Sequence, residues 1–268
     1  MNMSTCTSRE GPCAFVVTID TEADDEWGER PKTTYTNISV LPVFQELCDQ
    51  YGVRPTYLVT YDVATNATAR SILQELARDG NCEIGAHTHG WRTPPFVPQL
   101  DDTQVHSYLY EYPLNIQQEK LRHLTEYLAE VFERPILSHR AGRWGIDAQG
   151  IALLRALGYL VDTSVTPLRS WSGERSPATG IQGPSFIEAP RHPYYPAWDA
   201  IDQDGGTGLL EVPVTATVRG LMTGLVDERR LAHILHGAGR WRRLLRRSLQ
   251  WMGLARVVPL EPATQRVV

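Results

Sequence analysis

The chain has 268 residues, of which 42% are hydrophobic and 21% are charged, and its formal net charge at pH 7 is −5. This balance is that of a globular protein with a sizeable core, which excludes wholesale disorder, and the acidic charge argues against non-specific nucleic-acid binding. No apolar stretch approaches the roughly 18 residues that a membrane span needs. Residues 1–11 lack the apolar run of a secretion signal, so we expect a disordered tail there and a cytoplasmic location.

The N-terminal third of the chain alternates between strand and helix patterns. Continuous apolar and β-branched residues predict strands over residues 13–20, 54–60 and 83–87. Apolar residues at helical spacing predict helices over residues 39–51 and 66–78. Gly52 and Gly80 follow these two helices as stop signals.

The rest of the chain continues the alternation, interrupted by two irregular stretches. Residues 91–112 are rich in proline and aromatic residues and look too polar for a core position, and residues 168–208 form a long insertion. Helices are expected over residues 115–132 and 148–157, and strands over residues 135–138, 159–162 and 209–214. Such alternation predicts an α/β fold with parallel strands and crossover helices. We expect one domain over residues 12–268.

Polar and charged residues gather at or near the carboxyl ends of the predicted strands. They are Asp20, His87, Arg140, Asp162 and Glu211. In α/β barrels the active site lies at that face of the sheet. Residues of this kind at one edge are harder to explain by packing than the same residues scattered along the chain, so this edge is predicted to carry the active site.

Two of these strand ends carry a second polar residue two positions further on. Asp20 is followed by Glu22, and His87 is followed by His89. Side chains two apart on a strand point the same way. Neighbouring ends would therefore join carboxylates and imidazoles, the groups with which hydrolases bind a divalent metal and activate water. Each pair alone has an ordinary alternative, because acidic residues often begin a solvated loop, as residues 23–26 suggest, and histidine pairs occur in surface loops.

Arg140 lies among small residues in the segment 138–145, so the backbone there can pass close to another group. An arginine at a strand end can hold a carboxylate bidentately and keep it ionised. The alternative is a surface arginine without a particular partner. His139 should point away from Arg140 if the two lie on a strand, and we assign it no role.

Three segments resemble the motifs of the polysaccharide deacetylases, the NodB-homology group or carbohydrate esterase family four. They are residues 18–22, 83–89 and 139–142. In that family the first motif carries a base aspartate and a metal carboxylate, the second carries two metal-binding histidines, and the third carries an arginine. The resemblance extends over residues 14–214 and implies a distorted, incomplete (β/α) barrel. It indicates a divergent branch, with Asp-x-Glu in place of adjacent aspartates and His-x-His in place of histidines four apart.

The resemblance implies a metal-dependent hydrolase that removes acetyl groups from an acetylated sugar or polysaccharide, cutting a carbon–nitrogen bond. Asp20 would be the catalytic base, kept ionised by Arg140. The expected ligands of a divalent metal, with zinc as the first choice, are Glu22, His87 and His89. The candidate substrate-binding residues are Trp91, Arg143 and Trp144, although either tryptophan can equally be a packing residue.

The family closes with a last barrel strand whose histidine acts as general acid, and no match follows Val214. A basic helix is expected over residues 229–252, where His233 and His236 look like surface residues, and a histidine-free strand over residues 256–260. The arginine-rich run 240–247 either covers the barrel with its leucines or lies on an anionic lipid surface. Three explanations stay open: the barrel is incomplete, the acid comes from elsewhere, or the chain is C-terminally truncated and inactive. The alternative function is therefore a catalytically impaired, carbohydrate-binding or regulatory relic.

Overall fold

The computed structural model describes residues 14–24, 26, 33–98, 106–220 and 225–236 in full, and the backbone of residues 256–259. The tail expected over residues 1–11 and the arginine-rich run 240–247 lie outside the described residues. The same holds for the helix expected over residues 229–252 beyond residue 236.

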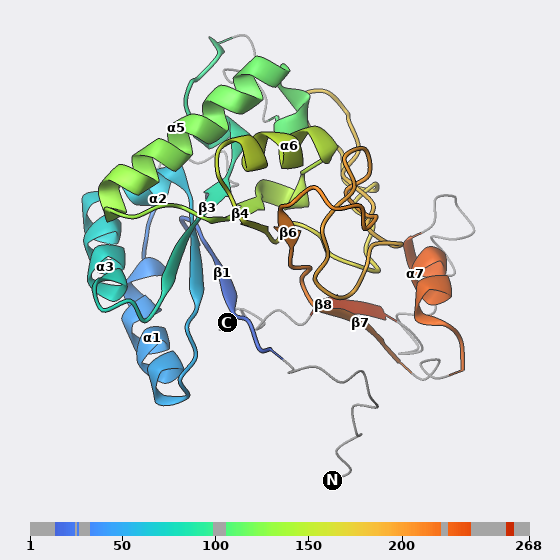
Figure 1. Cartoon of the computed structure of the whole chain (residues 1–268), viewed down its shortest axis with the longest axis horizontal. Helices are drawn as coiled ribbons and strands as arrows, with labels where there is room; N and C mark the ends of the chain where they lie inside the picture. The colour runs from blue at the N-terminus through green and yellow to red at the C-terminus, as the bar shows by residue number, and fades with distance from the viewer. Residues whose placement is uncertain are drawn as a thin grey trace.

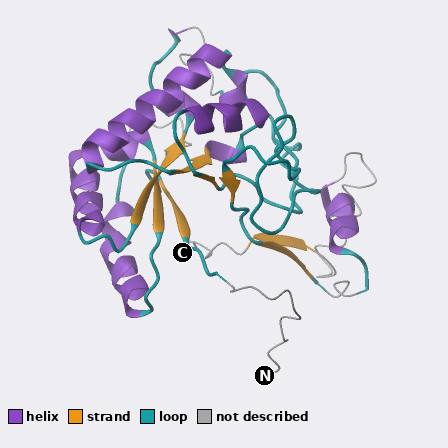
Figure 2. Cartoon of the chain, in the orientation of Figure 1, coloured by secondary structure: helices purple, strands orange, loops and turns teal. Residues whose placement is uncertain are grey.

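A sheet of six parallel strands is the centre of the described part of the chain (Figures 1 and 2). Its strands follow the chain order: β1 (Thr18–Thr21), β2 (Thr56–Val59), β3 (Glu83–Thr88), β4 (Ser138–Ala141), β5 (Val161–Asp162) and β6 (Leu210–Glu211). Every neighbouring pair runs parallel. Among the described residues β1 and β6 do not pair with each other, so the sheet is open. The predicted α/β fold, a distorted and incomplete barrel with parallel strands, is confirmed.

Helices pack on the sheet through their apolar stripes (Figure 1). They are α1 (Leu41–Gln50), α2 (Tyr61–Thr65), α3 (Ala67–Arg78), α5 (Leu114–Phe132) and α6 (Ala148–Ala156), together with the short 3-10 helices η1 (Ile38–Val40), η2 (Gly90–Arg92), η3 (Leu109–Glu111) and η4 (Gly142–Trp144). The side chains of Asn66 and Asp147 cap α3 and α6 by accepting a backbone N–H hydrogen bond. The core between helices and sheet includes Tyr57, Leu73, Ile84, Leu121, Leu124 and Leu128.

The first strand is shorter than its apolar sequence predicts. The expected buried strand over residues 13–20 is observed only from Thr18 onward, and Phe15 and Val16 are 80% and 58% exposed. Within the described residues β1 pairs only with β2, so it is an edge strand and the residues before it have no neighbouring strand to cover them.

Two further sequence predictions are wrong in detail. The strand expected over residues 135–138 is observed at Ser138–Ala141, a shift that brings Arg140 inside β4. The stretch 91–112 was expected outside the core, but Thr93, Tyr108 and Tyr112 are buried. The burial of Thr93 and Tyr112 is explained by the fully buried Lys120 of α5, whose ammonium donates hydrogen bonds to the carbonyls of Thr93 and Pro95 and lies over the ring of Tyr112.

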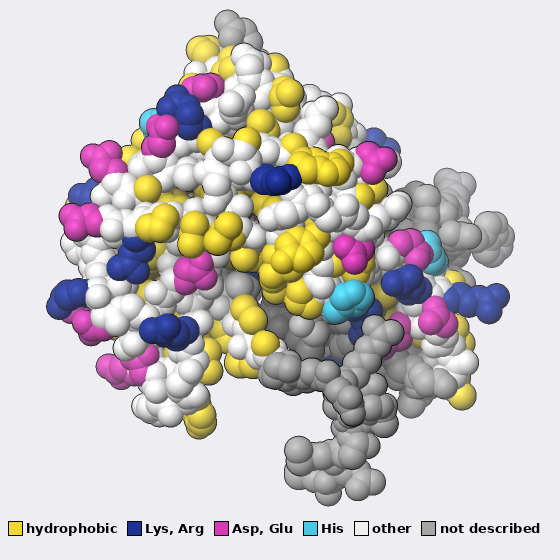
Figure 3. Space-filling model, in the orientation of Figure 1, with side chains coloured by type: hydrophobic (Ala, Val, Ile, Leu, Met, Phe, Trp, Pro, Cys, Tyr) yellow, Lys and Arg dark blue, Asp and Glu magenta, His cyan; other side chains and the backbone are white. Residues whose placement is uncertain are grey.

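The C-terminal strand expected over residues 256–260 exists but does not extend the parallel sheet. β8 (Arg256–Pro259) pairs antiparallel with β7 (Ala216–Arg219) in a separate two-stranded sheet. The helix α7 (Glu228–His236) packs beside it on a small apolar cluster that contains Leu168 and Val218. No described helix is long and apolar enough to cross a membrane. On the face drawn in Figure 3, acidic and basic side chains are interspersed.

Candidate metal and substrate site

The carboxyl ends of β1, β3 and β4 meet at one edge of the sheet. Asp20 lies near the end of β1, and Glu22 follows that strand. His87 lies in β3, in register with Arg140 of β4, and His89 follows β3. Parallel pairing thus turns three segments distant in sequence into one group of side chains, and it brings together all five residues that sequence reasoning assigned to catalysis and metal binding.

The side chains of Glu22, His87 and His89 form a compact donor cluster. The Nε2 atoms of the two imidazoles are 3.1 Å apart. Oε2 of Glu22 lies 3.3 Å from Nε2 of His89 and 3.7 Å from Nε2 of His87. The ligand atoms of the three residues all lie within 4.8 Å of one another, so the cluster could hold a metal ion.

The opposite nitrogen of each imidazole already has an acceptor. Nδ1 of His87 donates to the backbone carbonyl of Arg140, and Nδ1 of His89 donates to Oε1 of Glu26, both at 3.0 Å. Because Nδ1 is held by these acceptors, each imidazole directs Nε2 at the cluster. A metal ion would bind there in place of the Nε2 proton, as it does in metal-binding histidines. The cluster therefore fits a cation in its orientation as well as in its spacing.

Glu26 contacts His89 and is therefore a residue of the candidate site, one that sequence reasoning missed. It was expected in a solvated loop, but its side chain is fully buried, and its Oε2 accepts hydrogen bonds from Thr60 Oγ1 and the backbone N–H of Ala23. Burial raises the pKa of Glu26, but His89 and these hydrogen bonds outweigh burial and lower the pKa below its ordinary value. Glu26 ends a run of three acidic residues, Asp24 to Glu26, which offers no sequence signal that would single it out.

The charges around His87 favour a cation. Burial lowers the pKa of this imidazole, but the carboxylates of Asp20 and Glu22 outweigh burial and raise the pKa to about 9. The side chain of His87 is only 3% exposed, so these charges act with little screening by solvent. Positive charge is stabilised at the place where the three donors meet.

Arg140 is buried and forms an ion pair with Asp20. Its Nη1 donates to Oδ1 of Asp20 at 2.5 Å, while Nη2 donates to Thr18 Oγ1 and Nε to the carbonyl of Thr163. Asp20 receives one guanidinium bond rather than the expected bidentate pair, because the other nitrogens are engaged by the threonines. Burial raises the pKa of Asp20, but Arg140 and the histidines lower it below its usual value. The side chain of Asp20 stays 32% exposed, so it can reach a reactant.

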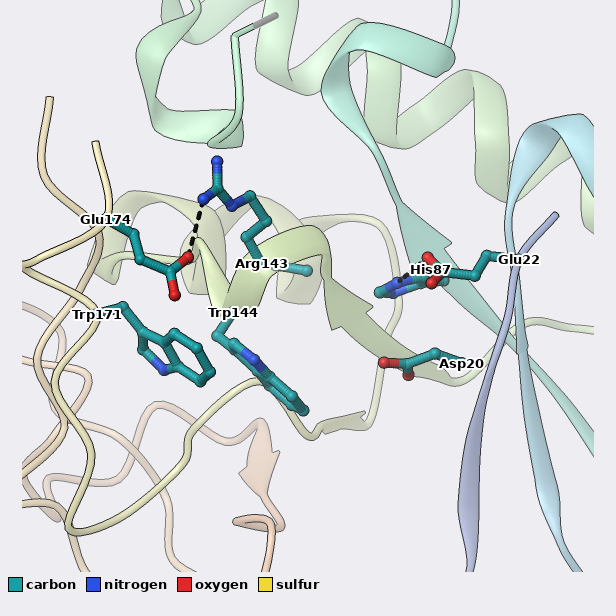
Figure 4. Close-up of a pocket in the computed structure, with 8 residues that line it drawn as sticks. Asp20, Glu22, His87, Arg143, Trp144, Trp171 and Glu174 are labelled. Atoms are coloured by element: carbon teal, nitrogen blue, oxygen red, sulfur yellow. Dashed lines mark hydrogen bonds and ion pairs between the residues drawn. The ribbon is translucent and has the colours of Figure 1, made fainter. Parts of the chain in front are cut away.

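A cavity of about 190 Å³ opens beside these residues (Figure 4). It is lined by Asp20, Glu22, His87, Ala141, Arg143, Trp144, Trp171 and Glu174. Two of the three residues that the sequence suggested for substrate binding, Arg143 and Trp144, are among them. Trp91 is not, since its ring stacks on His89 at 4.5 Å between centroids. Trp171 and Glu174 come from the insertion 168–208, whose irregular sequence carries no signal for them.

The other polar strand ends form a separate buried network. His139 donates from Nδ1 to Asp162 at 2.7 Å and contacts Thr88 through Nε2, so it faces a different partner from Arg140. Burial and the charge of Asp162 raise the pKa of Glu211 well above its ordinary value, so Glu211 is neutral. None of these groups lines the cavity described above.

No protein-family model matches this sequence, and no curated protein matches it. Several solved structures do. A protein assigned to the polysaccharide deacetylases from Mycobacterium smegmatis is 20% identical, with 75% of this chain and 58% of that chain covered and a TM-score of 0.47. IcaB from Ammonifex degensii is 14% identical, with 63% and 62% covered and a TM-score of 0.40.

A 4-alpha-glucanotransferase from Thermococcus litoralis also matches, at 12% identity, with 65% of this chain and 24% of that chain covered and a TM-score of 0.39. The chain spans less than two thirds of each of these three proteins. The family that the sequence motifs resemble is thus represented among the matching structures. At such identities and TM-scores the likeness says nothing about the reaction.

Proposed function

We propose that this protein is a metal-dependent hydrolase that removes the acetyl group from an acetylated sugar. The observation that carries the proposal is the meeting of two correctly oriented imidazoles and a carboxylate beside an arginine-held aspartate. The three sequence motifs support the same reaction class. A packing role explains this cluster poorly, because buried polar groups are otherwise costly unless they have a task or a full set of partners.

Glu22, His87 and His89 would hold the divalent ion. Two imidazoles and one carboxylate are a common ligand set of catalytic zinc, so zinc is the first choice. Bound there, the ion would supply Lewis-acid polarisation of the acetyl carbonyl and a lowered pKa of water.

Asp20 is the base of the proposed reaction. Its lowered pKa keeps it ionised at neutral pH, and its exposure lets it take a proton from the attacking water. The water oxygen bonds to the carbonyl carbon, and the bond from that carbon to the sugar nitrogen or oxygen breaks, which releases acetate. The sugar atom must then receive a proton. His87 is the only histidine among the described residues that line the cavity, so we assign the return of the proton to Asp20 as well.

The test combines metal content with acetate release by the purified full chain. We expect one divalent ion per chain and release of acetate from acetylated saccharides, with both lost in His87→Ala. A chain that binds no divalent metal, and whose His87→Ala variant behaves like the wild type, would refute the proposal. Saccharide binding by the metal-loaded chain without any acetate release would instead support a carbohydrate-binding relic.

A further inference from the structure

The insertion 168–208 contributes a wall to the cavity on the side away from the metal ligands. In Figure 4, Trp171 and Glu174 lie across the cavity from His87, with Trp144 between the two sides. The rings of Trp144 and Trp171 stack with 6.1 Å between centroids and 20° between planes. Both tryptophans line the cavity beside the reacting groups, and the guanidinium of Arg140 lies 5.0 Å from the ring centroid of Trp144.

Trp171 is held firmly in this position. Its Nε1 donates to Thr166 Oγ1 at 2.9 Å, and its backbone N–H donates to the carbonyl of Pro184 at 2.8 Å. The guanidinium of Arg169 lies 3.9 Å from its ring centroid. A side chain fixed in this way loses little conformational freedom when a ligand binds to it.

The polar part of the wall is an ion pair. Nη2 of Arg143 donates to Oε2 of Glu174 at 2.8 Å, and Nη1 donates to Ser107 Oγ at 2.7 Å. Arg143 and Trp144 both have left-handed backbone angles, with φ of 50° and 60°. Such angles are unfavourable for residues with a Cβ, and they persist at sites where a function requires the side-chain directions that they produce.

The chemistry of this wall matches one sugar ring. Aromatic side chains with a few fixed polar groups are the usual composition of a small-molecule site. The apolar face of a sugar ring can contact the tryptophans that line the cavity while its hydroxyls reach Arg143 and Glu174. A cavity of about 190 Å³ is smaller than the roughly 300–1,000 Å³ of sites for larger ligands, which suits a single ring.

The charges of the wall favour a neutral ring. Arg143, the arginine among the described lining residues, already faces the carboxylate of Glu174. The other ionisable lining side chains, Asp20, Glu22 and His87, lie on the metal side of the cavity. At the wall itself, the one guanidinium already faces the carboxylate of Glu174, so a carboxylate on the sugar would meet the negative charge of Glu174 there.

We propose that Trp171 and Glu174, together with Arg143 and Trp144, bind the sugar ring that carries the acetyl group and select a neutral ring over a carboxylated one. The position of the acetyl group rests on the proposed function. Ring binding itself can be measured without turnover.

The test is calorimetric titration of the full chain in an Asp20→Asn background, with N-acetylglucosamine and N-acetylmuramic acid as probes. The two probes share a ring and differ by a carboxylate-bearing substituent. We expect N-acetylglucosamine to bind at least about ten-fold more tightly, and Trp171→Ala to weaken its binding by about ten-fold or more. Trp198→Ala is the matched control, because Trp198 lies in the same insertion, is 57% exposed, and contacts Arg155 outside the cavity.

Glu174→Gln is the second variant, since it keeps the shape of the side chain and removes its charge. It leaves Arg143 able to pair with the probe carboxylate, so the preference for N-acetylglucosamine should shrink by about ten-fold. Three outcomes would each overturn the proposal. The first is equal binding of the two probes by the chain with an unmutated wall. The others are equal losses of binding in Trp171→Ala and Trp198→Ala, and an unchanged preference in Glu174→Gln.

The outcomes also separate the two proposals. The expected binding pattern without acetate release by the chain with Asp20 intact would overturn the proposed function and leave the sugar wall standing. Acetate release with a KM that does not respond to Trp171→Ala would overturn the proposed sugar-binding wall and leave the proposed function standing.

Discussion

The two sides of the cavity are built from different kinds of backbone. The metal side takes Glu22 from the end of β1 and His87 and His89 from the end of β3, two parallel strands that both pair with β2. The spacing of these residues in the sequence therefore sets their spacing in the structure. The far wall takes Trp171 and Glu174 from an irregular insertion, held by individual hydrogen bonds rather than by a repeating pattern. In the proposed site, strand ends and the residues directly after them carry the groups assigned to the metal and to the base, while the irregular insertion contributes side chains to the wall that would contact the ligand.

The largest effect is expected from Asp20→Asn, on the side of the cavity that strand ends form. Asparagine keeps the size of the side chain but cannot accept a proton from water, so kcat should fall by about 10²–10⁴-fold. Acetate release by the metal-loaded variant measures the effect, and metal content should stay near that of the wild type. A variant that retains most of its activity would remove Asp20 from the reaction.

Glu26→Gln tests whether the spacing of the three ligands on the strand ends is sufficient for metal binding, or whether a contact from the following loop is also needed. Three donors converge on the Glu26 carboxylate: His89 Nδ1, Thr60 Oγ1 and the N–H of Ala23. Glutamine offers one acceptor oxygen to these donors, so His89 should lose its fixed orientation and metal affinity should fall by about 10–100-fold.

Competition with a metal-binding dye measures that affinity in the absence of substrate. The matched control is Asp24→Asn in the same segment, because Asp24 is exposed and holds Thr34, Thr36 and Asn37 rather than a candidate ligand. Similar losses in the two variants would mean that Glu26 merely stabilises the loop.

The smallest effect is expected at Glu211, a strand-end residue that does not line the cavity. Its pKa in the folded protein lies well above the ordinary value of 4.5, because of burial and the charge of Asp162. The folded state therefore keeps a proton that the unfolded state releases, and wild-type stability should fall as pH rises above about 4.5, by at most about 1.4 kcal/mol per pH unit. Asp162, whose pKa is lowered, is ionised in both states in this range and adds no slope.

Glu211→Gln cannot ionise, so its stability relative to the wild type should increase between pH 5 and pH 8. Urea unfolding at the two pH values checks this, and a difference that is the same at both would contradict a neutral Glu211. If the Glu211→Gln variant still releases acetate, Glu211 has no part in the reaction, although it lies at the end of a strand in the same sheet as the metal ligands.

The sequence predicts most of the sheet and the five polar residues that converge at its edge. Period and composition identify β2, β3 and α5 closely, because buried parallel strands and amphipathic helices have distinct patterns. The predicted position of β4 was wrong because Arg140 and His139 interrupt its apolar run. The burial of these two side chains depends on partners in β1 and β5. Polar residues buried by such pairing look like loop residues until the pairing is known.

The residues that sequence reasoning missed share one cause. The position of Glu26 depends on a loop that returns to His89, and those of Trp171 and Glu174 depend on an insertion with only isolated bridges in place of strands. A loop path is set by contacts made one at a time, which no periodic pattern reports. Trp91 shows the converse: its position beside His89 was visible in the sequence, but the side on which its ring would stack was not.

The ion pair between Arg143 and Glu174 and the stacked rings of Trp144 and Trp171 form a joint between the segment that continues β4 and the insertion. The metal ligands precede this joint in the chain and do not depend on the insertion for their own contacts. In the proposed site, substitutions at Trp171 and Glu174 could therefore change the ligand preference while the residues assigned to the metal and to the base stay the same. The buried residues of the insertion, among them Phe186 and Ile187, would have to be kept, because they belong to apolar clusters of the fold.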